Sequence, residues 1–498
     1  MRAVGVGWGF PPNMKREAVI GAVWTLVERV GAQALSFAAF VILARLLHPE
    51  SYGLVTLAAS IVAVPSIFLN EGFNATLIQR ESLDDDHVNA AFWANLGLSL
   101  IFVAAVFGAS DWASEIARAP AMAPILRLVS LTMVPAAVGS VMAALFLRRL
   151  EYGTIALRTL VAQTSCALVA IVMAALGFGV WALVAQMLVF TVIGAAVLWR
   201  GACWRPRLSL STKAFRDIFH FSARTMLSNF LRFAHERADT LIIGVFLSPA
   251  ALGLYFLTQR LLATIEYVTV SPVVNVMMPV LSRMQGERER LGHTYVRMLS
   301  IGASLWVPTV VGIGAVSGHL FPLLFGDKWD GAQTVMSVMS VTAVSLCMTR
   351  PTREILLSMN RPGVYACLNA AQLVLLIALM LVGVRFGLAA AATAYVLASV
   401  LAVPLHLYAL SRYTSVSPCA VLARLLPVFG AGAVMAAAVY GAGIWASWGS
   451  WTLLPQIAIG IVTYPACLYL FAPAQIAEAA HAIYQSLPQR LRFLHLSP

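Results

Sequence analysis

Apolar segments long enough to cross a lipid bilayer follow one another along almost the whole chain. A helix needs about 20 apolar residues to span the hydrocarbon core of a bilayer. Of the 498 residues, 60% are hydrophobic and 11% are charged, whereas a soluble protein carries roughly 25% charged residues. The apolar segments are too long, and alternate too little, for the strands of a membrane barrel. The sequence therefore predicts an all-α protein that crosses the membrane many times.

About fourteen transmembrane helices are expected. Lysine and arginine gather in every second loop, and membrane proteins carry this excess on the cytosolic side. Both termini are therefore predicted to be cytosolic, and the net charge of +12 is attributed to these loops rather than to nucleic acid binding. The expected helices are 17–46, 53–78, 88–108, 124–147, 155–176, 178–200, 214–247, 252–282, 294–323, 331–358, 363–384, 387–411, 418–446 and 450–472.

One short turn occurs twice in the chain, 200 residues apart. In segments 47–54 and 247–254 the Leu, Pro, Gly and Leu residues coincide without a gap. Each copy follows a helix with a polar face, which predicts two homologous lobes of six helices related by an axis along the membrane normal. The predicted divisions are a cytosolic N-terminus 1–16, an N-lobe 17–200, a cytosolic linker 201–213, a C-lobe 214–411, two additional helices in 412–472 and a cytosolic tail 473–498.

Polar side chains within the apolar segments concentrate in the helices that open the two lobes. Ionisable residues are costly at membrane depth and usually face a cavity or a partner, so we expect a water-filled cleft between the lobes. Guanidinium groups pair well with phosphate oxygens, and a carboxylate in a cleft can take up a proton. The candidates for substrate binding are Arg29, Asn70, Asn74, Asn229, Arg232, Gln259 and Arg260. The candidates for ion coupling are Glu28, Glu71, His235, Glu236, Asp239 and Glu266.

A purely structural role remains an alternative for these charges. Arginines stand close in sequence to three of the carboxylates, so ion pairs could steady the helices instead of lining a cleft. The pairs in question are Glu28 with Arg29, Glu236 with Arg232, and Asp239 with Arg237. Six polar residues on one face of a helix exceed what pairing alone requires, which favours the cleft.

Motifs for cofactors and metals are absent from the sequence. There is no GxxxxGK[ST] loop for phosphate and no HExxH or GxSxG sequence, so neither a cofactor nor a metal is expected. The six cysteines are scattered without metal-binding spacing and are interpreted as packing residues. The acidic segment 84–87 could hold a metal–diphosphate group, but no second acidic cluster faces it, so a solvated loop is expected.

Four groups of motifs, taken in order, resemble one known family. They are Ala44–Leu47 with Pro49, Tyr52, Gly53, Gly72 and Leu77–Arg80; Arg148–Tyr152 with Gly177–Leu183; Arg237–Gly244 with Leu252–Tyr255 and Pro279–Ser282; and Leu324–Trp329. Over residues 40–420 the chain resembles the polysaccharide transporter family. Its members are the Wzx-type flippases of the multidrug/oligosaccharidyl-lipid/polysaccharide exporter superfamily.

The resemblance implies a fold and a function. The expected fold is a V-shaped carrier like the MATE and MurJ proteins, with two six-helix lobes and two additional C-terminal helices. The expected function is the flipping of undecaprenyl-diphosphate-linked oligosaccharides across the bacterial cytoplasmic membrane, by ion-coupled alternating access, for exopolysaccharide, surface polysaccharide or O-antigen synthesis. The implied partners are this lipid-linked substrate, membrane lipids, and a polymerase and glycosyltransferases by analogy with the family.

Two other functions are kept as alternatives. The same fold could export a drug or a peptidoglycan precursor. A membrane polymerase, ligase or glycosyltransferase could act on the same lipid carrier, but such an enzyme needs a sizeable outer loop. The longest outer loop expected, 109–123, offers only Asp111 and Glu115 as acids, so the chain is not expected to be an enzyme. In the transport hypothesis the lobes rock about the segment 200–216.

Overall fold

Regular structure in this protein is helical throughout the part that the structure describes. The computed structural model describes residues 14–79, 84–202, 204–207, 233–284, 286–445 and 449–473, and no strand occurs in these ranges. The chain divides into two compact units, 1–256 and 257–498. Each unit is therefore a bundle of helices, as the apolar segments of the sequence predict.

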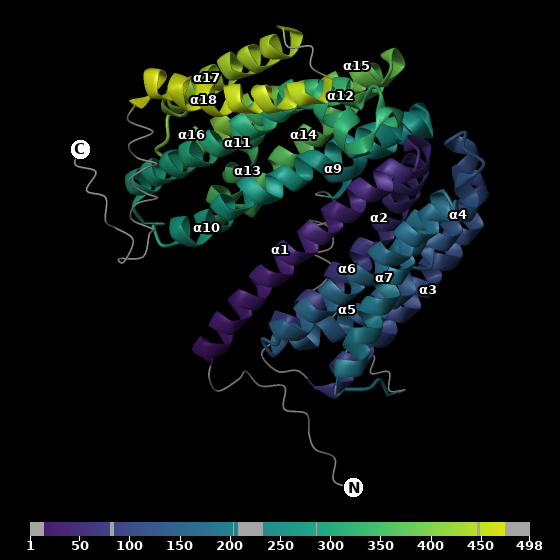
Figure 1. The fold of residues 1–498 in the computed structure, drawn as a ribbon. Helices are drawn as coiled ribbons and strands as arrows, with labels where there is room; N and C mark the ends of the chain where they lie inside the picture. The colour runs from purple at the N-terminus through teal and green to yellow at the C-terminus, as the bar shows by residue number, and fades with distance from the viewer. Residues whose placement is uncertain are drawn as a thin grey trace. The chain divides into compact units, whose positions relative to one another are not determined.

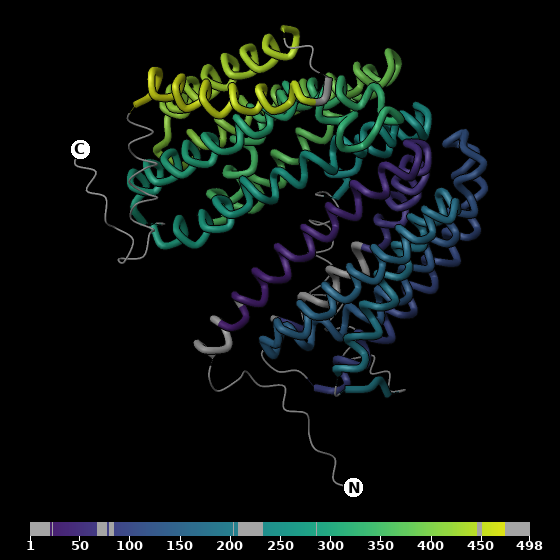
Figure 2. The backbone as a smooth tube through the Cα atoms, viewed as in Figure 1, coloured from purple at the N-terminus to yellow at the C-terminus, as the bar shows by residue number. Residues whose placement is uncertain are grey.

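Unit 1 contains the first seven helices (Figure 1). They are α1 (Met14–Leu46), α2 (Pro49–Gln79), α3 (Asp85–Ile116), α4 (Met122–Ser130), α5 (Met133–Arg148), α6 (Tyr152–Ala175) and α7 (Val180–Gly201). The first of them, α1, runs as one continuous tube (Figure 2). Residues 233–246 are also helical, and the division between the units falls inside the next helix, α9 (Pro249–Thr269).

Unit 2 holds the remaining helices. They are α10 (Ser271–Ser282), α11 (Arg288–Phe325), α12 (Ala332–Met339), α13 (Thr342–Ser358), α14 (Pro362–Gly383), α15 (Leu388–Leu401), α16 (Val403–Tyr413), α17 (Pro418–Trp445) and α18 (Leu453–Phe471). Short 3-10 turns lie at η1 (Asp327–Trp329), η2 (Val384–Phe386) and η3 (Gly449–Thr452). The two helices expected beyond the repeat, α17 and α18, pack side by side and both contact α11 (Figure 1).

The number of membrane crossings is only partly determined. Ten helices in the described ranges are long and apolar enough to cross a membrane, or up to twelve if two bent pairs each form one span. The other two expected helices, 53–78 and 214–247, coincide with α2 and with the helical residues 233–246, and parts of both lie outside the described side chains. A multi-pass membrane protein is thus confirmed, while the number fourteen stays a prediction.

The two units repeat one pattern of helix packing. In unit 1, α3 packs against α4 and α5, α4 against α7, and α6 against α7. In unit 2, α11 packs against α12 and α13, α12 against α15, and α14 against α15. In this pattern α11, α12, α13, α14 and α15 correspond to α3, α4, α5, α6 and α7. The duplication expected from the turn sequence is therefore visible in the packing of whole bundles. The exact lobe boundaries stay predictions.

A break in a helix is repeated at matching positions of the two units. The sequence predicts single helices at 124–147 and 331–358, but the chain is interrupted between α4 and α5 and between α12 and α13, where the bend is 53°. The Thr132 and Thr342 hydroxyls each donate to a carbonyl three residues earlier, at 2.6 Å. Such side-chain bonds compete with the helical ladder and bend it. The predicted helix 252–282 is likewise split, with a bend of 49° between α9 and α10.

The reversal that follows each broken helix is also repeated. Leu150 and Asn360 adopt positive φ angles of 59° and 56°. After each, a backbone N–H returns to a carbonyl five residues earlier, from Glu151 to Phe146 at 3.0 Å and from Arg361 to Leu356 at 2.9 Å. This bond closes the last turn of the helix as a left-handed cap does. Conserved local geometry 210 residues apart supports a duplicated origin of the two bundles.

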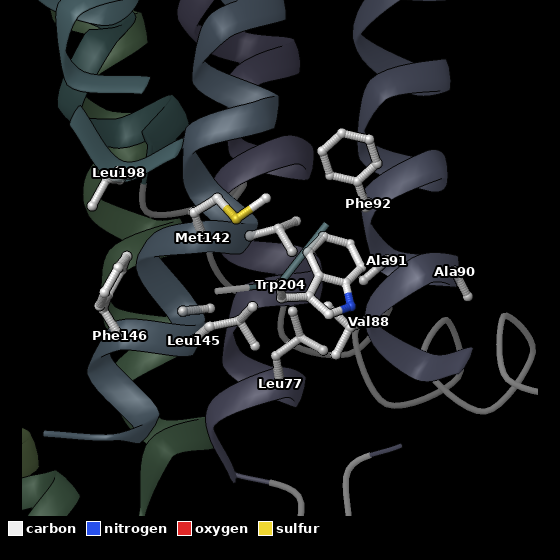
Figure 3. Packing of buried hydrophobic residues seen from close by; sticks show 12 residues of the cluster. Leu77, Val88, Ala90, Ala91, Phe92, Met142, Leu145, Phe146, Leu198 and Trp204 are labelled. Atoms are coloured by element: carbon white, nitrogen blue, oxygen red, sulfur yellow. The ribbon is translucent and has the colours of Figure 1, made fainter. Parts of the chain in front are cut away.

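The residues that follow α7 are fastened to unit 1. The Trp204 side chain is 5% exposed and lies among Met142, Leu145 and Val88 in an apolar cluster formed by α2, α3, α5 and α7 (Figure 3). The Arg207 backbone accepts a hydrogen bond from Trp93 Nε1 at 2.8 Å and donates one to the side chain of an asparagine in α3 at 2.8 Å. Residues 204–207 are thus held in place, which argues against a pivot at this end of the expected linker.

Candidate functional site

The repeated turns of the sequence meet inside unit 1. A Cβ atom on Gly53 would lie 1.7 Å from the carbonyl oxygen of Pro249, and one on Gly253 would lie 1.9 Å from that of Pro49. Neither distance leaves room for a side chain, so glycine is required at both positions for the two backbones to approach. The start of α2 and the start of α9 therefore contact each other reciprocally.

Aromatic side chains surround this contact. The rings of Tyr52 and Phe256 stack with centroids 5.8 Å apart, and the ring of Phe40 meets Tyr52 edge-on at 5.9 Å. Offset stacks and edge-to-face contacts are the favoured geometries of aromatic pairs. We call Phe40, Tyr52, Gly53, Gly253 and Phe256 the turn contact.

Asp239, an ion-coupling candidate, is deeply buried and is hydrogen-bonded to Tyr255, the residue before Phe256 of the turn contact. The Asp239 side chain is 3% exposed. The hydroxyl of Tyr255 donates to one carboxylate oxygen at 2.6 Å, and the backbone N–H of Thr240 donates to the other at 2.7 Å. Buried charges need such donors to offset the loss of hydration. Asp239 thus ties the helical residues 233–246 to α9.

Glu28, the first ion-coupling candidate, is engaged by α6. Thr159 Oγ1 donates to Glu28 Oε1 at 2.7 Å, and Glu28 also interacts electrostatically with Arg158. The Arg158 guanidinium lies 5.7 Å from the centre of the Phe190 ring, within reach of a cation–π contact. The adjacent substrate-binding candidate Arg29 is exposed. The sequence missed Arg158 because it stands alone in an otherwise apolar helix.

Glu266, the last ion-coupling candidate, forms an ion pair within unit 2. Arg350 Nε lies 2.8 Å from Glu266 Oε1, and Arg350 Nη2 donates to Oε2 at 3.3 Å. Two parallel contacts of this kind are the fork geometry by which arginine binds carboxylates and phosphates. Further along α13, Arg353 pairs with the buried Glu354. The Glu266–Arg350 pair could not be predicted from the sequence, because the two residues lie 84 residues apart on different helices.

The remaining candidates are only partly placed. Gln259 and Arg260 are half-buried on α9, His235 is half-buried, and Glu236 is exposed. Three candidates, Asn70, Glu71 and Asn74, lie on α2 where the side chains are outside the described residues, and two others, Asn229 and Arg232, lie outside them altogether. Among the described candidates, Glu28, Asp239 and Glu266 each take part in a separate polar contact, while the single predicted cleft stays a prediction.

Charged side chains are exposed inside one candidate span. α12 and α13 together form a bent candidate span, and within it the side chains of Arg350 and Arg353 are 47% and 44% exposed. A charged side chain that faces the hydrocarbon of a bilayer is costly. This face of α13 is therefore suited to water or to a polar ligand. No group of three or more His, Cys, Asp or Glu side chains that could hold a metal occurs in the described ranges.

Comparison with known proteins assigns the chain to one family. A family model described as "Polysaccharide biosynthesis protein" matches residues 42–334. The succinoglycan biosynthesis transport protein ExoT of Rhizobium meliloti (strain 1021) is 26% identical over 319 residues, which cover 64% of this chain and 65% of that protein. The lipopolysaccharide biosynthesis protein WzxC of Escherichia coli (strain K12) is 22% identical over 378 residues, which cover 74% and 76% of the two chains.

Solved structures confirm the fold. The inward closed conformation of the lipid II flippase MurJ superposes with a TM-score of 0.75 at 12% identity, covering 92% of this chain and all of that one. An inward-facing multidrug resistance MATE transporter of the MOP superfamily gives a TM-score of 0.60 at 17% identity, covering 76% and 94%. The expected MurJ-like fold is thus confirmed. The chain belongs to the polysaccharide biosynthesis protein family, whose model matches more than half of its length.

Proposed function

We propose that this protein is a transporter that flips a lipid-linked oligosaccharide across the cytoplasmic membrane of a bacterium for the synthesis of surface polysaccharide. The relatives named as transport and lipopolysaccharide biosynthesis proteins support this function, and so does the fold shared with a lipid II flippase. The chain itself supplies exposed charged side chains within a candidate span, which a sugar diphosphate could contact.

The observation that carries the proposal is the exposure of arginines within a candidate span. Arg350 and Arg353 on α13 are about half exposed, and Arg29 on α1 is exposed as well. A polar headgroup crossing the bilayer must be kept out of hydrocarbon, whereas its lipid tail can stay in the bilayer. Exposed guanidinium groups on otherwise apolar helices meet the first requirement.

Ion coupling is assigned to the carboxylates that the structure places in polar groups. Glu28, Asp239 and Glu266 each accept hydrogen bonds from a neighbouring helix. A change of charge at any of them would alter the contact between two helices, which is how a bound ion could favour one conformation over another. Both termini are assigned to the cytosol on the distribution of lysine and arginine. A polymerase and glycosyltransferases are the proposed partners.

The test is the location of lipid-linked oligosaccharide in cells that lack the gene. We expect the intermediate to accumulate on the cytosolic face and the surface polysaccharide to be lost, with recovery when the wild-type gene is returned. Unpolymerised repeat units on the outer face would instead mean that translocation survives without this protein. That result would overturn the proposal in favour of a membrane enzyme that acts after translocation.

A further inference from the structure

Two helices of unit 2 have no part in the function proposed above. α17 and α18 lie outside residues 42–334, which the family model matches. Both contact α11, the helix that corresponds to α3 of unit 1. In the described part of unit 1, the close neighbours of α3 are α2, α4 and α5, so no helix pair takes the place that α17 and α18 have on α11. The additional pair is therefore specific to the second bundle.

A proline leaves one backbone carbonyl of α11 without its usual partner. Pro308 lies near the middle of α11, and proline has no N–H to donate to the carbonyl four residues earlier. That carbonyl belongs to Ser304. A helix bends most easily at a proline, where this bond is missing. The corresponding helix α3 contains no proline, so α11 has a weak point that its counterpart lacks.

Tyr464 of α18 supplies the missing donor. Its hydroxyl donates to the Ser304 carbonyl at 3.1 Å, and its side chain is 7% exposed. A buried carbonyl without a donor is unfavourable. In membrane helices, groups on neighbouring helices satisfy carbonyls that a proline has freed. The bond from α18 therefore stabilises α11 at the carbonyl that Pro308 leaves open.

α17 holds the same part of α11 by close packing. A Cβ atom on Gly432 would lie 2.8 Å from Cγ1 of Val307, the residue before Pro308. The absence of a side chain on Gly432 allows this approach. The two additional helices are also tied to each other, because Gln456 Nε2 of α18 donates to the Val439 carbonyl of α17 at 3.1 Å. α17 and α18 thus contact α11 together, on both sides of the same turn in sequence.

We propose that α17 and α18 form a brace that fixes the direction of α11 at Pro308, that Tyr464 is its positioning residue, and that transport requires this brace. The inference rests on the proposed function and adds to it a role for the two additional helices. α11 packs against α13, which carries Arg350 and Arg353, so the direction of α11 also sets the position of these arginines. Without the Tyr464 hydroxyl, the two halves of α11 move more freely, and a rigid-body motion of the bundle is transmitted less completely.

Hydrogen exchange of the purified, full-length protein in detergent tests the bond without measuring transport. Y464F should speed the exchange of peptides from 300–312 about two- to tenfold, the factor for one net hydrogen bond to a neutral carbonyl. P308A gives position 308 an N–H for the Ser304 carbonyl, so Y464F should have no further effect in a P308A background. Y440F is the matched control, because Tyr440 of α17 is 65% exposed. Equal acceleration by Y464F with and without P308A would overturn the proposal.

A second set of variants tests the brace independently of the fate of P308A. G432A places a methyl group against Val307, so it should push α17 away and speed the exchange of the same peptides. In a V307A background the methyl group has room, and G432A should have no further effect. G430A is the matched control, because the nearest side chain, that of Phe471, lies 3.9 Å from its Cβ position. Equal exchange in G432A and G430A would refute the close contact of α17 with α11.

Complementation of cells that lack the gene tests the role of the brace in transport. At equal protein levels, Y464F and G432A should each lower surface polysaccharide at least about twofold, the lower end of the same range, while Y440F and G430A should match the wild type. A role in stability alone would change the amount of protein but not the polysaccharide made at equal amounts, and that result would overturn the proposal. Faster exchange with unchanged polysaccharide would refute the brace alone, whereas translocation in the deletion strain would refute transport.

Discussion

The α-carbon of Gly53 lies so close to Pro249 that a methyl group on the glycine would meet the proline carbonyl oxygen at 1.7 Å. The reciprocal relation holds between Gly253 and Pro49, at 1.9 Å. The two repeated turns of the sequence therefore fit closely against each other. The backbone of one fills the space that the missing side chain of the other leaves open.

Alanine at either glycine should therefore destabilise the protein strongly. The backbone carbonyl that a methyl group would meet cannot rotate away as a side chain can, so we expect G53A and G253A each to lower the free energy of unfolding by about 3 kcal/mol or more. The measurement is thermal unfolding in detergent. G97A in α3 is the control, because nothing lies within 4 Å of its Cβ position, and alanine there should be neutral or stabilise by up to about 1 kcal/mol. Equal melting temperatures for G53A and G97A would contradict the close contact.

Removal of the Tyr255 hydroxyl should destabilise the protein, because Asp239 stays buried with one hydrogen-bond donor fewer. Y255F deletes one hydrogen-bond donor to a carboxylate that is 3% exposed. We expect the free energy of unfolding to fall by about 1.5–3 kcal/mol, the range for hydrogen bonds to charged groups. Y464F is the matched comparison, because Tyr464 donates to the neutral carbonyl of Ser304 at 3.1 Å. It should lose only about 0.5–1.5 kcal/mol. The measurement is chemical denaturation of both variants. A smaller decrease in the free energy of unfolding for Y255F than for Y464F would argue against a charged Asp239.

The hydroxyl of Thr159 is expected to matter through Glu28. T159V keeps the shape of the side chain but removes the donor that lies 2.7 Å from the carboxylate, so unfolding should become easier by about 1.5–3 kcal/mol. T191V serves as the control, since the Thr191 hydroxyl bonds only to carbonyls of its own helix at 3.0–3.1 Å. The free energy of unfolding of T191V should differ from that of the wild type by no more than about 0.5 kcal/mol. If the two variants unfold alike, the Thr159 hydroxyl does not stabilise Glu28.

The anchoring of residues 204–207 can be tested through the Trp204 ring. W204A leaves a cavity in the cluster of Figure 3, and loss of a buried tryptophan costs about 3–5 kcal/mol. Protease cleavage near 204–207 should become faster as the segment detaches. W451A, at a side chain that is 73% exposed, should change stability by no more than about 0.5 kcal/mol. Slow cleavage of W204A would mean that the Trp93 and Asn89 contacts hold the segment unaided.

Much of the architecture could be predicted from local sequence. The lengths of the apolar segments predict most helix ends to within a few residues. The turn motifs indicate the family. The broken helices escaped prediction because Thr132 and Thr342 look like ordinary apolar-segment residues until their hydroxyls are seen bonding to the backbone. The partners of Glu28, Asp239 and Glu266 could not be predicted, because each partner lies on another helix.

The sequence by itself determined that this chain is a helical membrane protein with two related halves, because apolar length, loop charge and a repeated motif are properties of the linear chain. Only the tertiary structure decided which groups meet. Glu28 and Thr159 are 131 residues apart, and Glu266 and Arg350 are 84 apart. No helical periodicity relates residues at such separations. Their contacts exist because close van der Waals packing holds whole helices together in the membrane, and this packing brings the charges on those helices to their partners.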